Sequence, residues 1–146
     1  MPTILDPTYR AALVERLSKL TPESRPLWGS FDSRRMLCHL ADQLHVALGD
    51  VAVSDVSSVL KRTVLKWIVL YLPLPMPRGK IQTVPEMLSS EPESWAEDLD
   101  TVKKLLSRLA EAKSVGPHPA FGPLSHSQWA ILAAKHADHH LQQFGV

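Results

Sequence analysis

Apolar residues recur at helical spacing in five separate segments of this chain, and proline or glycine follows each of the first four. The segments are residues 9–20, 32–49, 59–71, 92–113 and 125–144. Ser125 with Gln128 three residues later matches a capping box, and Gly49 is a natural residue to end a helix. No segment alternates apolar and polar residues convincingly, as a half-buried strand does. We therefore predict an all-α protein, a four-helix bundle with an extra short N-terminal helix.

The length and charge of the chain narrow the classes of protein to consider. Its 146 residues suit a single domain with one core, spanning residues 1–146. Lys and Arg number 16 against 15 Asp and Glu, so no charge excess draws the protein to nucleic acid or to an anionic membrane. The longest uncharged apolar stretch, residues 67–77, is well short of the roughly 20 residues that cross a bilayer. We expect neither nucleic-acid nor membrane partners.

The cysteine content and the N-terminal sequence indicate a compartment. Cys38 is the only cysteine, which excludes an intramolecular disulfide and suits a reducing environment. The first residues contain neither a basic segment nor an apolar segment of the kind that forms an export signal. We therefore expect a cytoplasmic protein.

Two histidines lie four residues apart near the end of the last predicted helix. His136 and His140 fall on its apolar face, with Cβ atoms roughly 6 Å apart. The helix dipole stabilises a protonated, exposed histidine near a helix C-terminus, which would explain one such residue without a metal. Two protonated histidines buried at this distance would repel each other and would be costly. A shared divalent metal ion explains the pair better. His139 lies at the margin of the face and Asp138 points away from it, so we expect neither to bind the ion.

A metal site of this kind needs a third ligand, and the second predicted helix offers His39 beside its apolar arc. By itself, a histidine at the edge of a core is more often structural or solvated than a ligand. Cys38 lies about 100° away around the helix, so we expect a small, partly buried residue there and not a ligand. His45 lies among charged residues and is expected at the surface.

Several motifs spread over the chain belong together in one known pattern. They are Trp28-Gly29, residues 36–42 (MLCHLAD), residues 118–122 (HPAFG), Trp129 and residues 136–145 (HADHHLQQFG). With these motifs the chain resembles the DinB/YfiT-like superfamily of metal-binding four-helix bundles. More specifically, it resembles a branch of unknown function that has an early WG…MLxH segment and a late HPxFG…W…HxDHHLxQFG segment. The resemblance implies an up-down-down-up order of helices and a metal triad of His39, His136 and His140.

Three neutral imidazoles leave at least one coordination position for water or a substrate, as in catalytic sites. Imidazole ligands suit several divalent ions, of which we expect zinc or nickel ahead of iron or copper. Such an ion lowers the pKa of bound water or holds a thiolate, and the relatives implied by the resemblance include hydrolases and thiol-dependent transferases. We therefore predict a metal-dependent hydrolase or thiol transferase for an unknown small molecule, with a low-molecular-weight thiol as a second cofactor in the transferase case.

Two alternatives to an enzyme stay open at this point. The first is a non-enzymatic metal-binding or stress-related interaction module, in which the ion or the bundle shapes a surface. The second is a bundle without metal, in which the histidines are merely structural. An accessible site would favour chemistry, and a sealed one would favour a structural ion.

Four further residues are expected near the ion, and each also has a purely structural explanation. Gln43 lies one turn after His39, Gln143 shares the face of the two late histidines, and Trp129 is placed to line the cavity or to pack in the core. His118, in the loop before the last helix, either faces the site opening or closes the end of the bundle with Phe121.

Two further expectations concern Asp42 and the middle of the chain. Asp42 could orient the imidazole of His39, but its position favours solvation on the polar face. The tryptophans are expected in the core. Residues 70–76 are apolar and rich in proline, so they suit a dimer contact or a lid over the site. A triad sealed by Trp129 and residues Pro73–Pro77 would favour a structural ion. We expect a homodimer.

Overall fold

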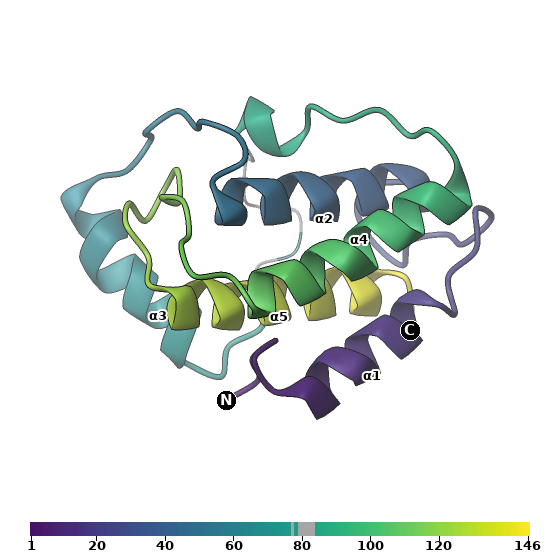
Figure 1. Cartoon of the computed structure of the whole chain (residues 1–146), viewed down its shortest axis with the longest axis horizontal. Coiled ribbons are helices and arrows are strands. Elements are labelled where there is room, and N and C mark those ends of the chain that lie inside the picture. The colour runs from purple at the N-terminus through teal and green to yellow at the C-terminus, as the bar shows by residue number, and fades with distance from the viewer. Residues whose placement is uncertain (77, 79–83) are drawn as a thin grey trace.

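The computed structural model describes residues 1–76, 78 and 84–146. Over these residues the chain is helical and contains no strand, and its single isolated β-bridge joins His118 to Gly122. The prediction of an all-α fold is confirmed. The elements, shown in Figure 1, are α1 (Pro7–Leu17), α2 (Ser33–Leu48), the π-helix η1 (Lys61–Leu65), α3 (Lys66–Tyr71), the 3₁₀-helix η2 (Pro85–Met87), α4 (Trp95–Ala110) and α5 (His126–Gln143).

Side-chain caps determine where α2 and α5, the helices that carry the candidate histidines, begin. Asp32 caps α2, because its carboxylate accepts the backbone N–H of Arg35 at 2.8 Å. At α5, Ser125 accepts the N–H of Gln128 and the side chain of Gln128 accepts the N–H of Ser125. The predicted capping box is therefore confirmed. Gly49 follows the last residue of α2, as predicted.

Two predicted helices begin at residues other than those expected, and in each case a cap is the reason. α1 begins at Pro7, because the Asp6 carboxylate accepts backbone N–H groups of the first turn. α4 begins at Trp95 and not at Pro92, because Ser94 accepts the N–H of Glu97 and so caps the helix. Pro92 lies in the extended segment before that cap.

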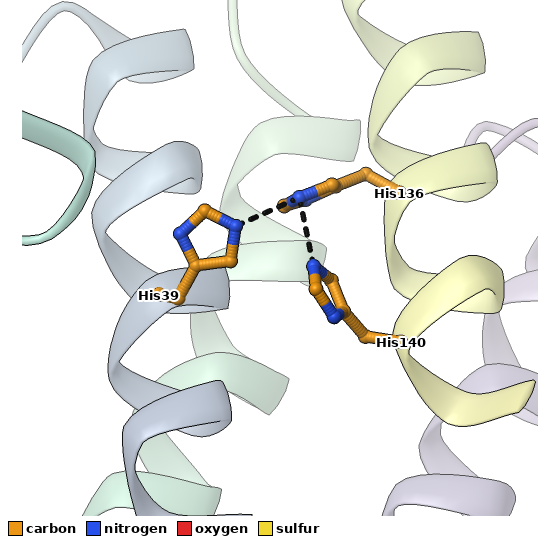
Figure 2. A group of neighbouring side chains, drawn as sticks. All are labelled: His39, His136 and His140. Atoms are coloured by element: carbon orange, nitrogen blue, oxygen red, sulfur yellow. Dashed lines mark hydrogen bonds between the residues drawn. The ribbon is translucent and has the colours of Figure 1, made fainter. Parts of the chain in front are cut away.

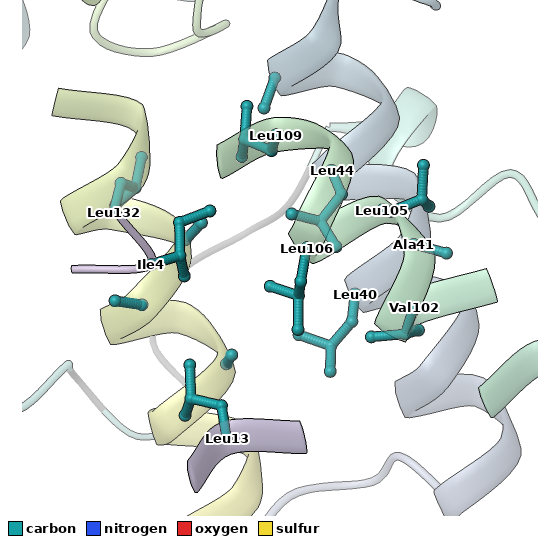
Figure 3. Packing of buried hydrophobic residues seen from close by; sticks show 14 of the residues in the cluster. Ile4, Leu13, Leu40, Ala41, Leu44, Val102, Leu105, Leu106, Leu109 and Leu132 are labelled. Carbon is teal, nitrogen blue, oxygen red and sulfur yellow. The ribbon is translucent and has the colours of Figure 1, made fainter. Parts of the chain in front are cut away.

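The core lies where α4 crosses α2 and α5. Figure 1 shows α2 and α5 side by side and running in opposite directions, with α4 across them, and α1 packs against α4 and α5. Figure 3 shows the apolar side chains that α2 and α4 bury against each other, namely Leu40, Ala41, Leu44, Val102, Leu105, Leu106 and Leu109. This arrangement turns another side of α2 toward α5.

The end of α2 touches the loop before α5 at a pair of glycines. The backbone N–H of Gly116 donates to the carbonyl of Ala47 at 2.8 Å. A Cβ atom on Gly116 would lie 2.7 Å from the carbonyl oxygen of Val46 and 2.9 Å from the Cα atom of Gly49. Only glycine allows this approach, which fixes the position of the loop along the axis of α2.

The third predicted helix is divided into η1 and α3, and most of its apolar residues are exposed. Leu70 is fully buried, but Leu60, Val64 and Trp67 are 65%, 53% and 58% exposed. The expectation that the tryptophans lie in the core is wrong for Trp67, whereas Trp129 is fully buried. Among the described elements α3 contacts only α5 and η1, which directly precedes it in the chain. α5 is therefore the one packing partner against which α3 can bury a row of apolar side chains.

The apolar stretch after α3 is also largely at the surface. Leu72 and Leu74 are 45% and 57% exposed, and Pro77 lies outside the described residues. The Lys135 ammonium of α5 donates to the carbonyls of Val69 and Leu72, which ties the end of α3 to α5. The assignment of residues 70–76 to a lid or a dimer contact stays a prediction. No helix in the described part of the chain is long and apolar enough to cross a membrane.

A leucine-to-alanine substitution should lower the stability of the protein more on the buried face of the 59–71 segment than on its exposed face. Leu70→Ala is expected to lower the free energy of unfolding by about 2–5 kcal/mol, because it removes buried methyl groups and leaves a cavity. Leu60→Ala removes the same atoms from an exposed side chain and is expected to change it by about 0.5 kcal/mol or less. Urea unfolding followed by circular dichroism compares the two, and equal losses would contradict the observed orientation.

Candidate metal centre

Three imidazoles from two helices meet between α2 and α5, as Figure 2 shows. The Nε2 atom of His136 lies 3.0 Å from Nε2 of His39 and 3.2 Å from Nε2 of His140. One nitrogen from each ring lies within 4.8 Å of the other two. A tetrahedral ion with metal–nitrogen bonds of about 2.0–2.1 Å holds its nitrogens about 3.3 Å apart, so the cluster has dimensions that suit one ion.

The helices bring the rings together in a simple way. His136 and His140 are one turn apart on α5 and share a face, and His39 approaches from the antiparallel α2. His39 and His140 are only 5% and 6% exposed, while His136 is partly exposed. The ring of Phe31 covers the pair of buried histidines, with its centroid 5.2 Å from that of His39 and 6.0 Å from that of His140.

The outer nitrogens of two rings determine where their protons lie. Nδ1–H of His39 donates to the carbonyl of Met87 at 2.8 Å, and Nδ1–H of His140 donates to Oε1 of Gln143 at 2.8 Å. Because carbonyl and amide oxygens only accept hydrogen bonds, Nδ1 must carry the proton in both neutral rings. Each Nε2 then presents its lone pair to the centre of the cluster, as in metal-binding histidines.

His136 completes the cluster but lacks such an outer partner. Its Nδ1 atom is buried and has no hydrogen-bond partner among the residues that the structure describes. A proton on Nε2 of His136 could form a hydrogen bond with the Nε2 lone pair of His39 or with that of His140, but not with both. A cation at the centre would accept the lone pairs of all three rings, so the donor set fits a metal ion better than it fits a network of hydrogen bonds.

The electrostatic environment keeps all three rings neutral. Burial lowers the pKa of His39 below its ordinary value, and burial together with the neighbouring His39 lowers the pKa of His140 to about 3. The pKa of His136 lies well below its ordinary value, because of burial first and of His140 and His39 next. Neutral imidazole is the form that binds metal ions.

His118 and Trp129, two of the expected pocket residues, stabilise the loop before α5. Nδ1 of His118 accepts the backbone N–H groups of Ala120 and Phe121 at 3.1 Å each, and its ring stacks on Phe121 at 4.5 Å between centroids. The Trp129 indole donates to the carbonyl of Gly116 at 2.7 Å. Of the two roles predicted for His118, the geometry supports the one that closes the end of the bundle with Phe121.

Asp42 lies in a place that the sequence did not predict. It is 4% exposed, and its carboxylate accepts the backbone N–H of Ser90 at 3.0 Å and the hydroxyl of Ser90. The expected solvation on a polar face is therefore wrong, because the segment after η2 covers this side of α2. Asp42 does not hydrogen-bond His39 directly. It holds Ser90, three residues after Met87, and the carbonyl of Met87 accepts the hydrogen bond from His39. Gln43 is buried one turn beyond His39, and its role in a pocket stays a prediction.

The residues placed outside the site by the sequence do lie outside the triad. Asp138 pairs with Arg16 at 2.6 Å, on the side of α5 that faces α1. His139 packs edge-on against the ring of Trp28, with 6.0 Å between centroids. Cys38 is buried, and burial raises the pKa of its thiol to about 11, so it is not a thiolate ligand at neutral pH.

Sequence reasoning missed the groups that hold the ligands in place. The carbonyl of Met87 is a backbone group and leaves no mark in a pattern of side chains. Phe31 stands just before the cap of α2 and carries no signal of its proximity to the histidines. A signal for the neighbourhood of Gln143 did exist, because Trp28-Gly29 is one of the motifs on which the family resemblance rests, and the carbonyl of Trp28 accepts from the Gln143 amide at 2.7 Å.

The fold and this cluster define an all-helical protein with a three-histidine site of suitable size for a metal ion. Residues 5–145 match the family described as Protein of unknown function (DUF1569). The match covers nearly the whole chain, and the protein belongs to this family. The search of curated proteins and the search of solved structures found no match.

Acid should destabilise the protein in the presence of a chelator. Burial lowers the pKa of His118 from 6.5 to about 4 and that of His140 from 6.5 to about 3, so the unfolded chain binds more protons between these values. The contribution of the neutral rings to the free energy of unfolding is therefore complete above pH 6.5 and is lost as the pH falls. For His118 the loss is about 2 kcal/mol by pH 5 and about 3 kcal/mol below pH 4. Urea unfolding at pH 7.5, 6 and 5 measures this loss.

His118→Asn is the matched control for this pH dependence. Its side-chain oxygen can still accept the backbone N–H of Ala120, but it does not titrate, so the fall in stability with acid should be shallower than in the wild type. Stability that is unchanged or higher at pH 5 than at pH 7.5 would contradict the assignment of neutral, buried rings.

Proposed function

We propose that this protein binds one divalent metal ion through His39, His136 and His140 and is a metal-dependent enzyme, either a hydrolase or a thiol-dependent transferase, acting on a small molecule. One observation carries the proposal. The three Nε2 atoms converge within reach of a single ion, while Met87 and Gln143 hold the protons of two of the rings on the outer side. Imidazole ligands favour zinc or nickel, ahead of iron or copper.

The chemistry follows from the number and nature of the ligands. Three protein nitrogens leave at least one coordination position free, which is the arrangement of catalytic sites. The bound ion would lower the pKa of a water molecule or activate the sulfur of a low-molecular-weight thiol. Burial holds the three rings neutral, and the ring of Phe31 packs beside those of His39 and His140. No described carboxylate joins the three histidines in the cluster.

We also propose that the fold is the up-down-down-up four-helix bundle of the DinB/YfiT-like superfamily, formed by α1, α2, α4 and α5. Figure 1 shows α1 and α5 running in one direction and α2 and α4 in the other, which supports this order. In this assignment the additional helix is the short α3 and not the expected N-terminal helix. Two further proposals concern the surroundings of the protein. The exposed Leu60, Val64 and Trp67 support a homodimer contact, and the buried free Cys38 suits a reducing cytoplasm.

The second candidate is a non-enzymatic metal-binding module with a role in interaction or stress. The observation that favours it is the burial of His39 and His140, which are 5% and 6% exposed. Of the three proposed ligands, His136 is the one that is partly exposed. A site with such limited access suits a structural ion as well as it suits a small substrate.

Metal analysis of untagged protein tests the metal site, which both candidate functions require. The wild type is expected to retain about one equivalent of zinc or nickel per chain, because three neutral imidazoles form one site. His39→Ala, His136→Ala and His140→Ala are each expected to lower the bound metal to near zero. His45→Ala is the control, since His45 contacts Asp50 at the far end of α2 and not the triad. Equal, near-zero metal in wild type and variants would contradict the site.

A substrate screen separates the enzyme from the module. The metal-loaded wild type is tested with ester, amide and phosphate substrates and, in parallel, with electrophiles in the presence of a thiol. The enzyme proposal expects turnover in one of these classes that His136→Ala abolishes and His45→Ala keeps. Full metal occupancy without turnover in any class would favour the interaction module.

A further inference from the structure

Gln143 bridges a metal ligand and a distant loop with the two ends of its amide group. Its Oε1 accepts Nδ1–H of His140 at 2.8 Å, and its Nε2 donates to the carbonyl of Trp28 at 2.7 Å. The side chain is 4% exposed. Rotating the amide by 180° would place two oxygens together at Trp28 and an N–H group against the protonated Nδ1 of His140. The carbonyl of Trp28 therefore determines which end of Gln143 faces His140.

The loop that carries this carbonyl is held unusually close to α5. Leu27 donates its backbone N–H to the backbone carbonyl of Gln143 at 2.7 Å. Gly29 has a φ of +82°, and a Cβ atom at this position would lie 2.5 Å from Nε2 of Gln143. Any other residue would therefore be strained and would displace the amide. This explains in physical terms why glycine follows Trp28.

We propose that Gln143 is a positioning residue, which fixes the tautomer of His140 and so directs its Nε2 lone pair to the centre of the triad. The carbonyl of Trp28 holds the amide, and Gly29 provides the room. The link to metal affinity rests on the proposed metal site, whereas the effect on the tautomer does not. Without Gln143, Nδ1 of His140 has no acceptor that requires its proton, and the Nε2–H tautomer, which cannot bind the ion, becomes populated.

The same turn of α5 offers a matched control. Gln142 is exposed, and its amide donates to Asp138, which lies outside the triad, at 2.7 Å. Substituting either glutamine by methionine keeps a side chain of similar length and removes the hydrogen bonds. Only the change at position 143 removes an acceptor from a ring of the triad.

The decisive measurement is the tautomer of His140 in the protein stripped of metal, read from long-range ¹H–¹⁵N correlation spectra. Wild type and Gln142→Met are expected to show a protonated Nδ1 and an unprotonated Nε2. Gln143→Met is expected to show a large share of the Nε2–H form, and Gly29→Ala a shift in the same direction. Gln143→Glu keeps an acceptor for His140, although it loses the hydrogen bond to Trp28, and is expected to keep the wild-type tautomer. If Gln143→Met does not fold, Gly29→Ala is the second test, and an unchanged tautomer there would contradict the proposal.

Zinc titration against a competing chelator connects the tautomer to metal binding. Gln143→Met is expected to weaken zinc binding about 10- to 100-fold, as loss of a hydrogen bond behind a metal ligand does. Gln142→Met is expected to change it less than about twofold, and the loss in Gln143→Glu should be smaller than in Gln143→Met.

Three outcomes decide among the claims. An unchanged His140 tautomer in Gln143→Met would overturn the positioning role. A changed tautomer with unchanged zinc affinity would overturn its link to the metal. A wild type that binds no zinc or nickel would refute the proposed metal site, and the spectra would still decide whether Gln143 sets the tautomer.

Discussion

Burying three imidazole rings against one another is the constraint on which the rest of this structure depends. Each ring must be neutral, and two of them, His39 and His140, keep a lone pair on the inner side while their N–H groups find acceptors on the outer side. Two acceptors come from outside the positions that carry the ligands, because a helix uses its own carbonyls for its own backbone. The segment after α3 provides the carbonyl of Met87 for His39, and the end of α5 provides Gln143 for His140.

Each of these acceptors is itself held by a second contact with a distant part of the chain. Asp42 holds Ser90 and thereby the turn that presents Met87, and Trp28 holds the amide of Gln143. The segments at residues 27–29 and 84–90 are thus part of the site as much as the helices that carry the three histidines are. His136 differs, since its Nδ1 atom finds no partner in the described chain. Of the three rings, it is the one whose tautomer no outer hydrogen bond fixes.

Much of the fold could be predicted from the sequence, because caps and helical periodicity are local signals. Asp32 and the pair Ser125 and Gln128 placed α2 and α5, and with them the spacing of His136 and His140. His39 was weakly indicated by geometry and emerged through a family resemblance. The exposure of Trp67 could not be predicted, because periodicity tells which residues share a face but not whether a neighbour covers it. Burial of Asp42 depends on a contact 48 residues away, for which no local signal exists.

The glycine contact between the end of α2 and the loop before α5 fixes the position of α2 along α5, because the Trp129 indole of α5 also holds Gly116. Gly116 meets Gly49 ten residues beyond His39, about 15 Å along the helix axis. Because the two helices are antiparallel, this contact sets how far α2 can slide along α5. A slide of one turn, about 5.4 Å, would carry His39 past the other two nitrogens. The register that brings the three histidines together therefore depends on two small residues that lie outside the cluster.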